Sequence, residues 1–132
     1  MSVTVDTNVL VRYTMRDDPG QAEAARRAIA EADVVCIPVV ALCEYVWVLR
    51  SAFNLQKADI RAALGVLLGA ENVRVDGLVV TTGLAMLDAG GDFADGVIGV
   101  EGRWLGGDEV VTFDRQAAEL LPQAGVPARY LG

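Results

Sequence analysis

The sequence predicts an α/β fold with a mostly parallel central sheet and helices on both faces. Short β-branched runs alternate along the chain with longer segments whose apolar residues recur at helical spacing, and this alternation is typical of parallel strands joined by helical crossovers. The chain has 132 residues, of which 53% are hydrophobic, enough for one sizeable core. No repeat, linker or low-complexity segment interrupts it, so we expect a single domain over residues 1–132.

The predicted strands are short runs rich in valine, and most of them end at a polar residue or a proline. They cover residues 3–5, 34–37, 72–75, 109–112 and 127–130. The predicted helices begin after a favourable capping residue or end at glycine. They cover residues 9–15, 19–31, 39–53, 57–68, 78–89, 93–105 and 115–121. Asp18 before Pro19, Asp92 and Asp114 are the expected N-caps, because an aspartate side chain accepts from the free N–H groups of a first turn.

The helix predicted over residues 93–105 contains three glycines. Gly96, Gly99 and Gly102 recur at every third position, and each costs about 1 kcal/mol relative to alanine inside a helix. Their spacing places them roughly on one face. We therefore expect another element to pack closely against that face.

The composition excludes several classes of site. The chain has no histidine, which excludes a Ser-His-Asp triad, a histidine zinc site and a histidine general base. Cys36 and Cys43 lie in apolar stretches and are expected to be buried free thiols. The net charge of −7 disfavours tight non-specific nucleic-acid binding, but it permits a nucleic-acid substrate whose phosphates meet bound cations.

No apolar run is long enough to span a membrane, and no signal peptide is visible at the N-terminus. We therefore expect a cytoplasmic protein with no membrane partner.

Five carboxylates stand at positions where chemistry is expected. Asp6 ends the first strand and Asp114 follows the strand at 109–112, and in open α/β sheets ligands bind at this carboxyl edge. Asp92 and Asp95 share a helix face at spacing i, i+3. Glu44 interrupts an apolar helix with no Lys or Arg one turn away, and its burial would be costly unless it is paired or binds a cation.

Each carboxylate also has a purely structural interpretation. Asp6, Asp92 and Asp114 are favourable N-caps, and Asp95 lies in a first turn where the helix dipole favours an anion. Taken together, however, oxygen ligands without histidine suit Mg²⁺ or Mn²⁺. Such ions generate a nucleophile from water and clamp the oxygens of a phosphodiester, so the residues favour metal-dependent phosphodiester hydrolysis.

At these residues the sequence resembles a PIN domain, and more narrowly the VapC-type toxins of bacterial toxin–antitoxin pairs. The resemblance rests on Asp6-Thr7-Asn8, Glu44 in its apolar helix, Asp92 to Asp95, and Thr112-Phe113-Asp114-Arg115, and it extends over essentially the whole chain. It implies a small α/β ribonuclease with an acidic pocket that holds Mg²⁺ or Mn²⁺. It also implies an RNA substrate, a homodimer and inhibition by a small cognate antitoxin protein.

The same resemblance assigns roles to individual residues. It makes Asp6, Glu44 and Asp95 the core acidic ligands, Asp114 a fourth, more variable ligand, and Asp92 an additional acidic position seen in part of the family. Small polar residues that orient the carboxylates or the water correspond to Thr7, Asn8 and Thr112. Arg12 and Arg115 are candidates for phosphate contact, although each also fits an ordinary surface salt bridge.

Two other functions remain open from the residues. An aspartyl-phosphate phosphatase or receiver-like domain would use Asp6 as a nucleophile, but no second aspartate follows two residues later. A non-catalytic binding module of the same fold would present Trp47 and Trp104 in an apolar interface, although core burial is the commoner location of such residues.

Overall fold

The computed structural model describes residues 1–132 and contains seven helices and five strands. It divides into two compact units, Met1–Val75 and Asp76–Gly132, which are described separately. All strand pairs are parallel, so the prediction of an α/β fold with parallel strands is confirmed. The strands form a three-stranded sheet in the first unit and a two-stranded sheet in the second.

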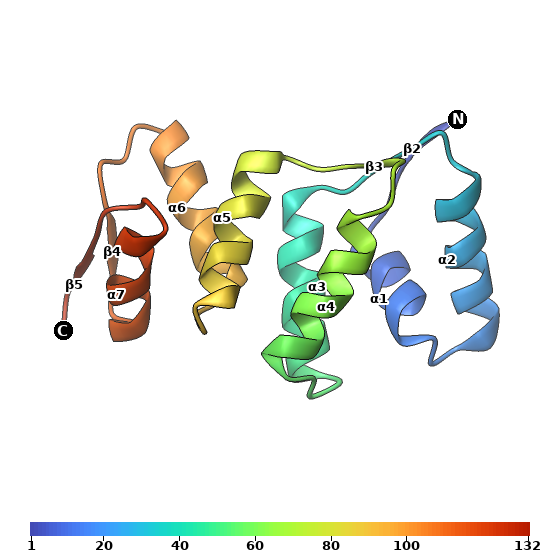
Figure 1. Cartoon of the computed structure of the whole chain (residues 1–132), viewed down its shortest axis with the longest axis horizontal. Coiled ribbons are helices and arrows are strands. Elements are labelled where there is room, and N and C mark those ends of the chain that lie inside the picture. Colours follow the sequence, from blue (N-terminus) through green and yellow to red (C-terminus); the bar gives the residue numbers. More distant parts are fainter. The chain divides into compact units, whose positions relative to one another are not determined.

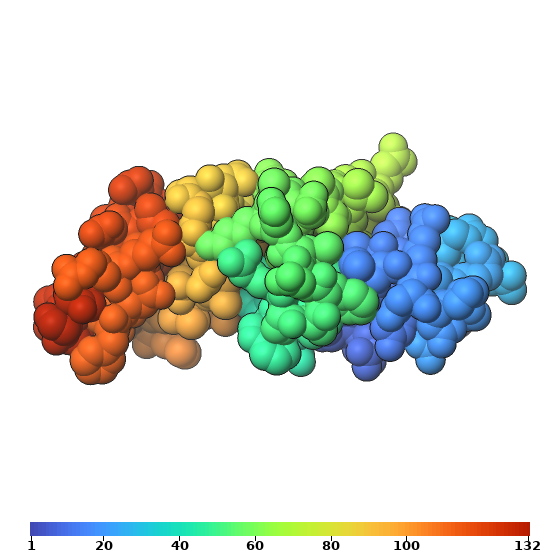
Figure 2. Space-filling model, turned by 90° about the horizontal axis from the view of Figure 1, so that it is seen from below, coloured from blue at the N-terminus to red at the C-terminus, as the bar shows by residue number.

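The first unit alternates strands and helices around the sheet β1-β2-β3. Its strands are β1 (Ser2–Thr4), β2 (Val34–Cys36) and β3 (Val73–Arg74). Its helices are α1 (Thr7–Met15), α2 (Pro19–Glu31), α3 (Val39–Ser51) and α4 (Lys57–Leu68). Helices α1 and α2 lie side by side, in two shades of blue in both Figure 1 and Figure 2.

Apolar side chains from every helix of the first unit form its core. Full burial is reached by Leu10 of α1, Val35 of β2, Leu42 and Leu49 of α3, and Leu64 of α4. Each such side chain contributes about 1.5–3 kcal/mol by leaving water. These residues recur at helical spacing in the sequence, which explains why the periodicity located the helices correctly.

One polar contact in this core joins α1 to α3. Tyr45 is fully buried, and its hydroxyl lies 2.6 Å from Oγ1 of Thr14. Burial raises the pKa of Tyr45, so the phenol stays neutral and can share this hydrogen bond with the threonine. The bond satisfies a polar group that would otherwise be costly to bury.

The second unit contains α5 (Gly77–Asp88), α6 (Phe93–Trp104), β4 (Val110–Thr112), α7 (Arg115–Gln123) and β5 (Ala128–Tyr130). Figure 1 shows α5 beside α6, and α7 against the β4–β5 pair, in agreement with the contacts. The core of this unit includes Met86, Ala117, Leu121 and Val126. The register aligns Thr112 with Tyr130, which brings the ends of β4 and β5 together.

Two of the three glycines of α6 allow close packing, as the sequence predicts. A Cβ on Gly96 would lie 2.7 Å from the carbonyl oxygen of Thr82 in α5, and a Cβ on Gly99 would lie 2.7 Å from Cγ1 of Val126. No atom lies within 4 Å of a Cβ built on Gly102. The spacing therefore identified the packed face but included one glycine that the packing does not require.

Several predicted boundaries differ from the structure. Helix α1 begins at Thr7, two residues earlier than expected, and α7 continues through Pro122 to Gln123. Asp18 and Asp114 accept from first-turn N–H groups as predicted, whereas Asp92 occupies the N-cap position without a side-chain capping bond. Cys36 and Cys43 are free thiols, but both are half-buried, so the expectation of full burial was wrong because each lies at the margin of its core.

None of the helices combines the length and the apolar character that a membrane span requires.

Replacement of Gly96 tests the close contact of α5 and α6. We expect Gly96→Ala to lower the free energy of unfolding by about 1–3 kcal/mol, because the added methyl group meets backbone atoms that cannot move aside. Gly102→Ala is the matched control in the same helix. It should leave stability unchanged or raise it by up to about 1 kcal/mol, since the space is open. Urea unfolding followed by circular dichroism measures both, and equal stability of the two variants would contradict the packing.

Candidate metal centre

In the first unit, the turn from β1 into α1 positions Asp6. Asp6 has extended backbone angles, and its Oδ1 accepts from the backbone N–H of Val9 at 3.1 Å. This is an N-cap, which uses one carboxylate oxygen and leaves the other without a role in the cap. Asp6 is exposed at the end of the strand, so the predicted location at the strand-to-helix turn is correct.

Thr7, the first residue of α1, connects this turn to α3. Its hydroxyl donates to Oε1 of Glu44 at 3.3 Å. A hydrogen bond of this kind restricts the orientation of a carboxylate. The functional role that the family resemblance implies for Thr7 stays a prediction. The first unit thus brings Thr7 and Glu44 together, although they are 37 residues apart in sequence.

Glu44 is exposed, and the expectation of a costly buried carboxylate was wrong. Its neighbours Leu42 and Tyr45 are fully buried, but Val40 and Trp47, one turn before and after it, are 66% and 67% exposed. Helix α3 therefore has a solvent-facing stripe that contains apolar residues as well as Glu44. The apolar composition of the helix did not indicate this stripe. Glu44 is positioned by its hydrogen bond with Thr7 and is not desolvated.

Asn8 and Arg12 line one surface pocket with Asp6, between α1 and α2. The guanidinium of Arg12 donates to Oε1 of Gln21 at 2.7 Å and forms a salt bridge with Asp17 at 3.1 Å. Arg12 is thus held by two partners of the first unit. The ordinary salt-bridge interpretation of this arginine is therefore the one its contacts support.

In the second unit, three carboxylates converge. One oxygen from each of Asp92, Asp95 and Asp114 lies within 4.8 Å of the other two. Asp92 is the N-cap residue of α6, Asp95 lies in the first turn of that helix, and Asp114 comes from the turn between β4 and α7. The contact of α6 with α7 joins the two halves of the group.

Asp114 is held in the same manner as Asp6. Its Oδ1 accepts from the backbone N–H of Ala117 at 3.0 Å, and its own N–H donates to Oγ1 of Thr112 at 2.9 Å. Thr112 therefore holds the backbone at Asp114, and its role in orienting a carboxylate or water stays a prediction. As at Asp6, the cap uses one oxygen of the carboxylate and leaves the second outside the cap.

The environment of Asp95 disfavours its charge. Partial burial, followed by the charges of Asp92 and Asp114, raises the pKa of Asp95 above its ordinary value. Helix packing holds the three acids together although they repel one another. A cation among them would relieve the repulsion and favour the ionised form of each.

The donor set fits a hard divalent cation. All three side chains offer carboxylate oxygens, two are exposed and one is half-buried, and neither histidine nor cysteine is among them. Mg²⁺ and Mn²⁺ bind such oxygen ligands and retain waters of their own, which the exposed side of the group can accommodate.

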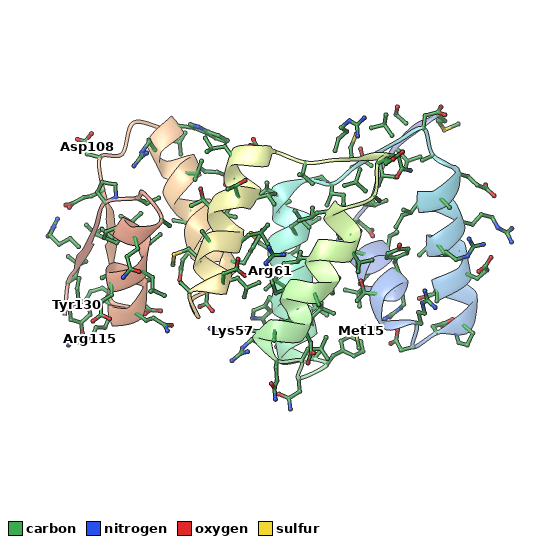
Figure 3. The ribbon with its side chains drawn as sticks, viewed as in Figure 1. Met15, Lys57, Arg61, Asp108, Arg115 and Tyr130 are labelled. Carbon is green, nitrogen blue, oxygen red and sulfur yellow. The ribbon has the colours of Figure 1, made fainter.

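Arg115 follows Asp114 directly and contacts an aromatic ring. Its guanidinium lies over the ring of Tyr130, 4.4 Å from the centroid. The two residues are labelled next to each other in Figure 3. Tyr130 was missed by the sequence analysis. No local signal could reveal it, because the contact arises from the parallel register that aligns β5 with β4.

The structure divides the five predicted acids between the units. Asp6 and Glu44 belong to the first unit, and Asp92, Asp95 and Asp114 belong to the second, where they form one group. The association of all five in a single site stays a prediction.

The raised pKa of Asp95 predicts an unusual pH dependence of stability. The folded protein holds the Asp95 proton more tightly than the unfolded chain, so stability from this group is present at low pH and is lost as pH rises through the folded pKa. In EDTA at neutral pH, Asp95→Asn should therefore be more stable than the wild type. The difference should disappear below pH 3.8, the ordinary pKa of aspartate.

Urea unfolding across this pH range measures the effect, with Glu119→Gln on an exposed site of α7 as the control. A variant Asp95→Asn that is less stable than wild type at neutral pH in EDTA would contradict the repulsion described above.

Comparison with known proteins supports the family expected from the residues. A comparison with curated proteins found no match to the chain. The family model described as PIN domain matches residues 3–120, which include all five acids. PIN domains are generally metal-dependent nucleases that use divalent ions. The chain therefore belongs to the PIN domain family.

Proposed function

We propose that the protein is a Mg²⁺- or Mn²⁺-dependent endoribonuclease that hydrolyses phosphodiester bonds of RNA. The observation that carries the proposal is the convergence of the Asp92, Asp95 and Asp114 carboxylates within 4.8 Å, in a chain that the PIN model matches. Asp6, Glu44, Asp95 and Asp114 are the proposed catalytic ligands, and Asp92 is an additional metal ligand. The association of the acids of both units rests on the family pattern.

A bound divalent ion would supply charge neutralisation at the phosphodiester and activation of water. The residues of the chain prepare the site for this ion. Helix capping holds Asp6 and Asp114 by one oxygen each, which restricts the orientation of each carboxylate and leaves its second oxygen outside the cap. Thr7 orients Glu44 through its hydroxyl, and Thr112 orients the backbone at Asp114.

The phosphates of an RNA substrate require positively charged contacts near the site, although the protein as a whole is acidic. Arg115 carries its guanidinium on the Tyr130 ring next to Asp114, and we propose it as a phosphate contact. Asn8 shares a surface pocket with Asp6 and is the proposed polar contact there. Arg12 keeps the same proposed role only if the substrate displaces its bonds to Asp17 and Gln21.

The biological setting follows from the resemblance alone. We propose that the protein is the toxin of a VapC-type toxin–antitoxin pair in the cytoplasm, that it is a homodimer, and that a small cognate antitoxin inhibits it.

A non-catalytic binding module is the second candidate function. It is favoured by Trp47 and Trp104, which are 67% and 54% exposed instead of buried in a core. Large exposed apolar side chains of this kind mark association surfaces in many proteins. In a toxin the same residues would serve dimerisation or antitoxin binding, so metal binding and catalysis must distinguish the two functions.

Metal-dependent cleavage tests the proposal directly. We expect the wild type to bind Mn²⁺ in calorimetry and to cleave RNA. Asp95→Asn should lose both properties, with a fall in cleavage rate of about a hundredfold or more because a direct ligand is removed. Asp6→Asn combined with Glu44→Gln should have the same effect if the acids of both units serve one site.

Glu101→Gln is the matched control, since it removes an exposed acid from the same helix α6 outside the acidic group. It should bind Mn²⁺ and cleave RNA as the wild type does. Wild-type protein that binds no Mn²⁺ and cleaves no RNA would refute the proposed function and favour the binding module.

A further inference from the structure

Phe113 is an aromatic residue that the proposed catalytic machinery does not use. It lies at the carboxyl end of β4, between Thr112 and Asp114, and 78% of it is exposed. A phenylalanine ring in water loses the free energy that its burial would provide, so neither the core nor the sheet explains this residue. Because Phe113 directly precedes a proposed metal ligand, its exposed ring lies where a bound substrate would be within reach.

The backbone on both sides of Phe113 is held in place. The N–H of Asp114 donates to Oγ1 of Thr112, and the N–H of Leu131 donates to the carbonyl of Thr112 at 2.8 Å. On the other side, Asp114 begins α7 through its cap to Ala117. The ring is thus presented to solvent from a fixed turn, which lowers the entropy lost when it contacts a ligand.

A positively charged group lies in the same turn. Arg115 is exposed and rests on the Tyr130 ring, and it has no carboxylate partner. The other two arginines of this unit are occupied, because Arg103 donates to the carbonyl of Gly125 and Arg129 pairs with Glu109. Arg115 is therefore the arginine of residues 76–132 whose guanidinium is least engaged by protein oxygens, and it is the best placed to contact a phosphate.

An exposed ring, one carboxylate and a guanidinium thus follow one another at Phe113, Asp114 and Arg115, and Asp92 and Asp95 at the start of α6 lie beside that carboxylate. We propose that Phe113 stacks on an unpaired base of single-stranded RNA, while Arg115 contacts a neighbouring phosphate, so that the backbone is presented to the acidic group. This inference rests on the proposed function for its substrate. It adds to that function a residue that contacts the substrate.

The preference of Phe113 for a single strand follows from the chemistry of stacking. Inside a duplex both faces of each base are covered by neighbouring bases, whereas an unpaired base can place one face on an aromatic side chain. Every base has such a face, so Phe113 should increase affinity for single strands without selecting a sequence.

The test compares variants that change aromaticity with variants that keep it. Phe113→Leu keeps an apolar side chain and removes the ring, and Phe113→Trp keeps a ring. Binding is measured with Ca²⁺ in place of Mn²⁺, so that a divalent ion neutralises the acidic group while cleavage is slowed, by the anisotropy of labelled RNA of mixed sequence, as a single strand and as the matching duplex. We expect Phe113→Leu to bind the single strand about 5- to 100-fold more weakly, Phe113→Trp to bind it as the wild type does, and duplex binding to be equal in all three.

Cleavage in Mn²⁺ provides a second readout that a structural role would not change. Phe113→Leu should raise KM and leave kcat near the wild-type value, because the ring binds the substrate and does not touch the reacting atoms. Circular dichroism should show equal folding of the variants, since the side chain is exposed.

The outcomes separate this inference from the proposed function. If the wild type cleaves RNA and Phe113→Leu binds and cleaves as well as the wild type, the inference is overturned and the ribonuclease stands. If Phe113→Leu instead changes the oligomeric state in sedimentation while RNA affinity is unchanged, Phe113 is a protein contact and the inference is again overturned. Aromatic-dependent binding of single strands without any cleavage would support the inference and refute the ribonuclease.

Discussion

The close approach of α5 and α6 is the constraint on which the second unit depends. At Gly96 the two helices meet backbone to backbone, and at Gly83 the ring of Phe93 occupies the space that a side chain would fill. Phe93 is the first residue of α6 and lies between the helix cap Asp92 and the first-turn acid Asp95. The packing that buries Phe93 therefore also determines where the two carboxylates are held, because a helix start cannot move independently of its buried anchor.

Helix packing brings the three carboxylates of the second unit together although their charges repel one another. Partial burial and two neighbouring charges raise the pKa of Asp95, so the metal-free group is strained electrostatically and stabilised by the surrounding core. This combination is typical of sites whose charge is completed by a ligand. A cation would find three carboxylate oxygens within 4.8 Å of one another, so only small side-chain adjustments would be needed to bind it.

A strand followed by an aspartate cap occurs in both units. After β1 and after β4 an aspartate caps the following helix through one oxygen, as Asp76 also does at the start of α5. Thr7 beside Asp6 donates to Glu44, whereas Oγ1 of Thr112, two residues before Asp114, accepts from the N–H of Asp114. A strand followed by a capped helix start positions a carboxylate at low cost, since the cap itself stabilises the helix. Each cap leaves the second carboxylate oxygen outside the helix start, so the capping interpretation of Asp6 and Asp114 is compatible with their proposed role as ligands.

The sequence by itself determined the helices, the parallel strand pairing, the caps at Asp18 and Asp114, and the family, because periodicity, capping and motif spacing are local properties of the chain. The tertiary structure alone decided which residues meet. Glu44 lies on an exposed stripe with Trp47, Asp92 leaves its cap unmade within the acidic group, and Tyr130 reaches Arg115 through the register of β4 and β5. Such contacts depend on how separate elements pack and pair, and no local pattern encodes the distance between two side chains far apart in the sequence.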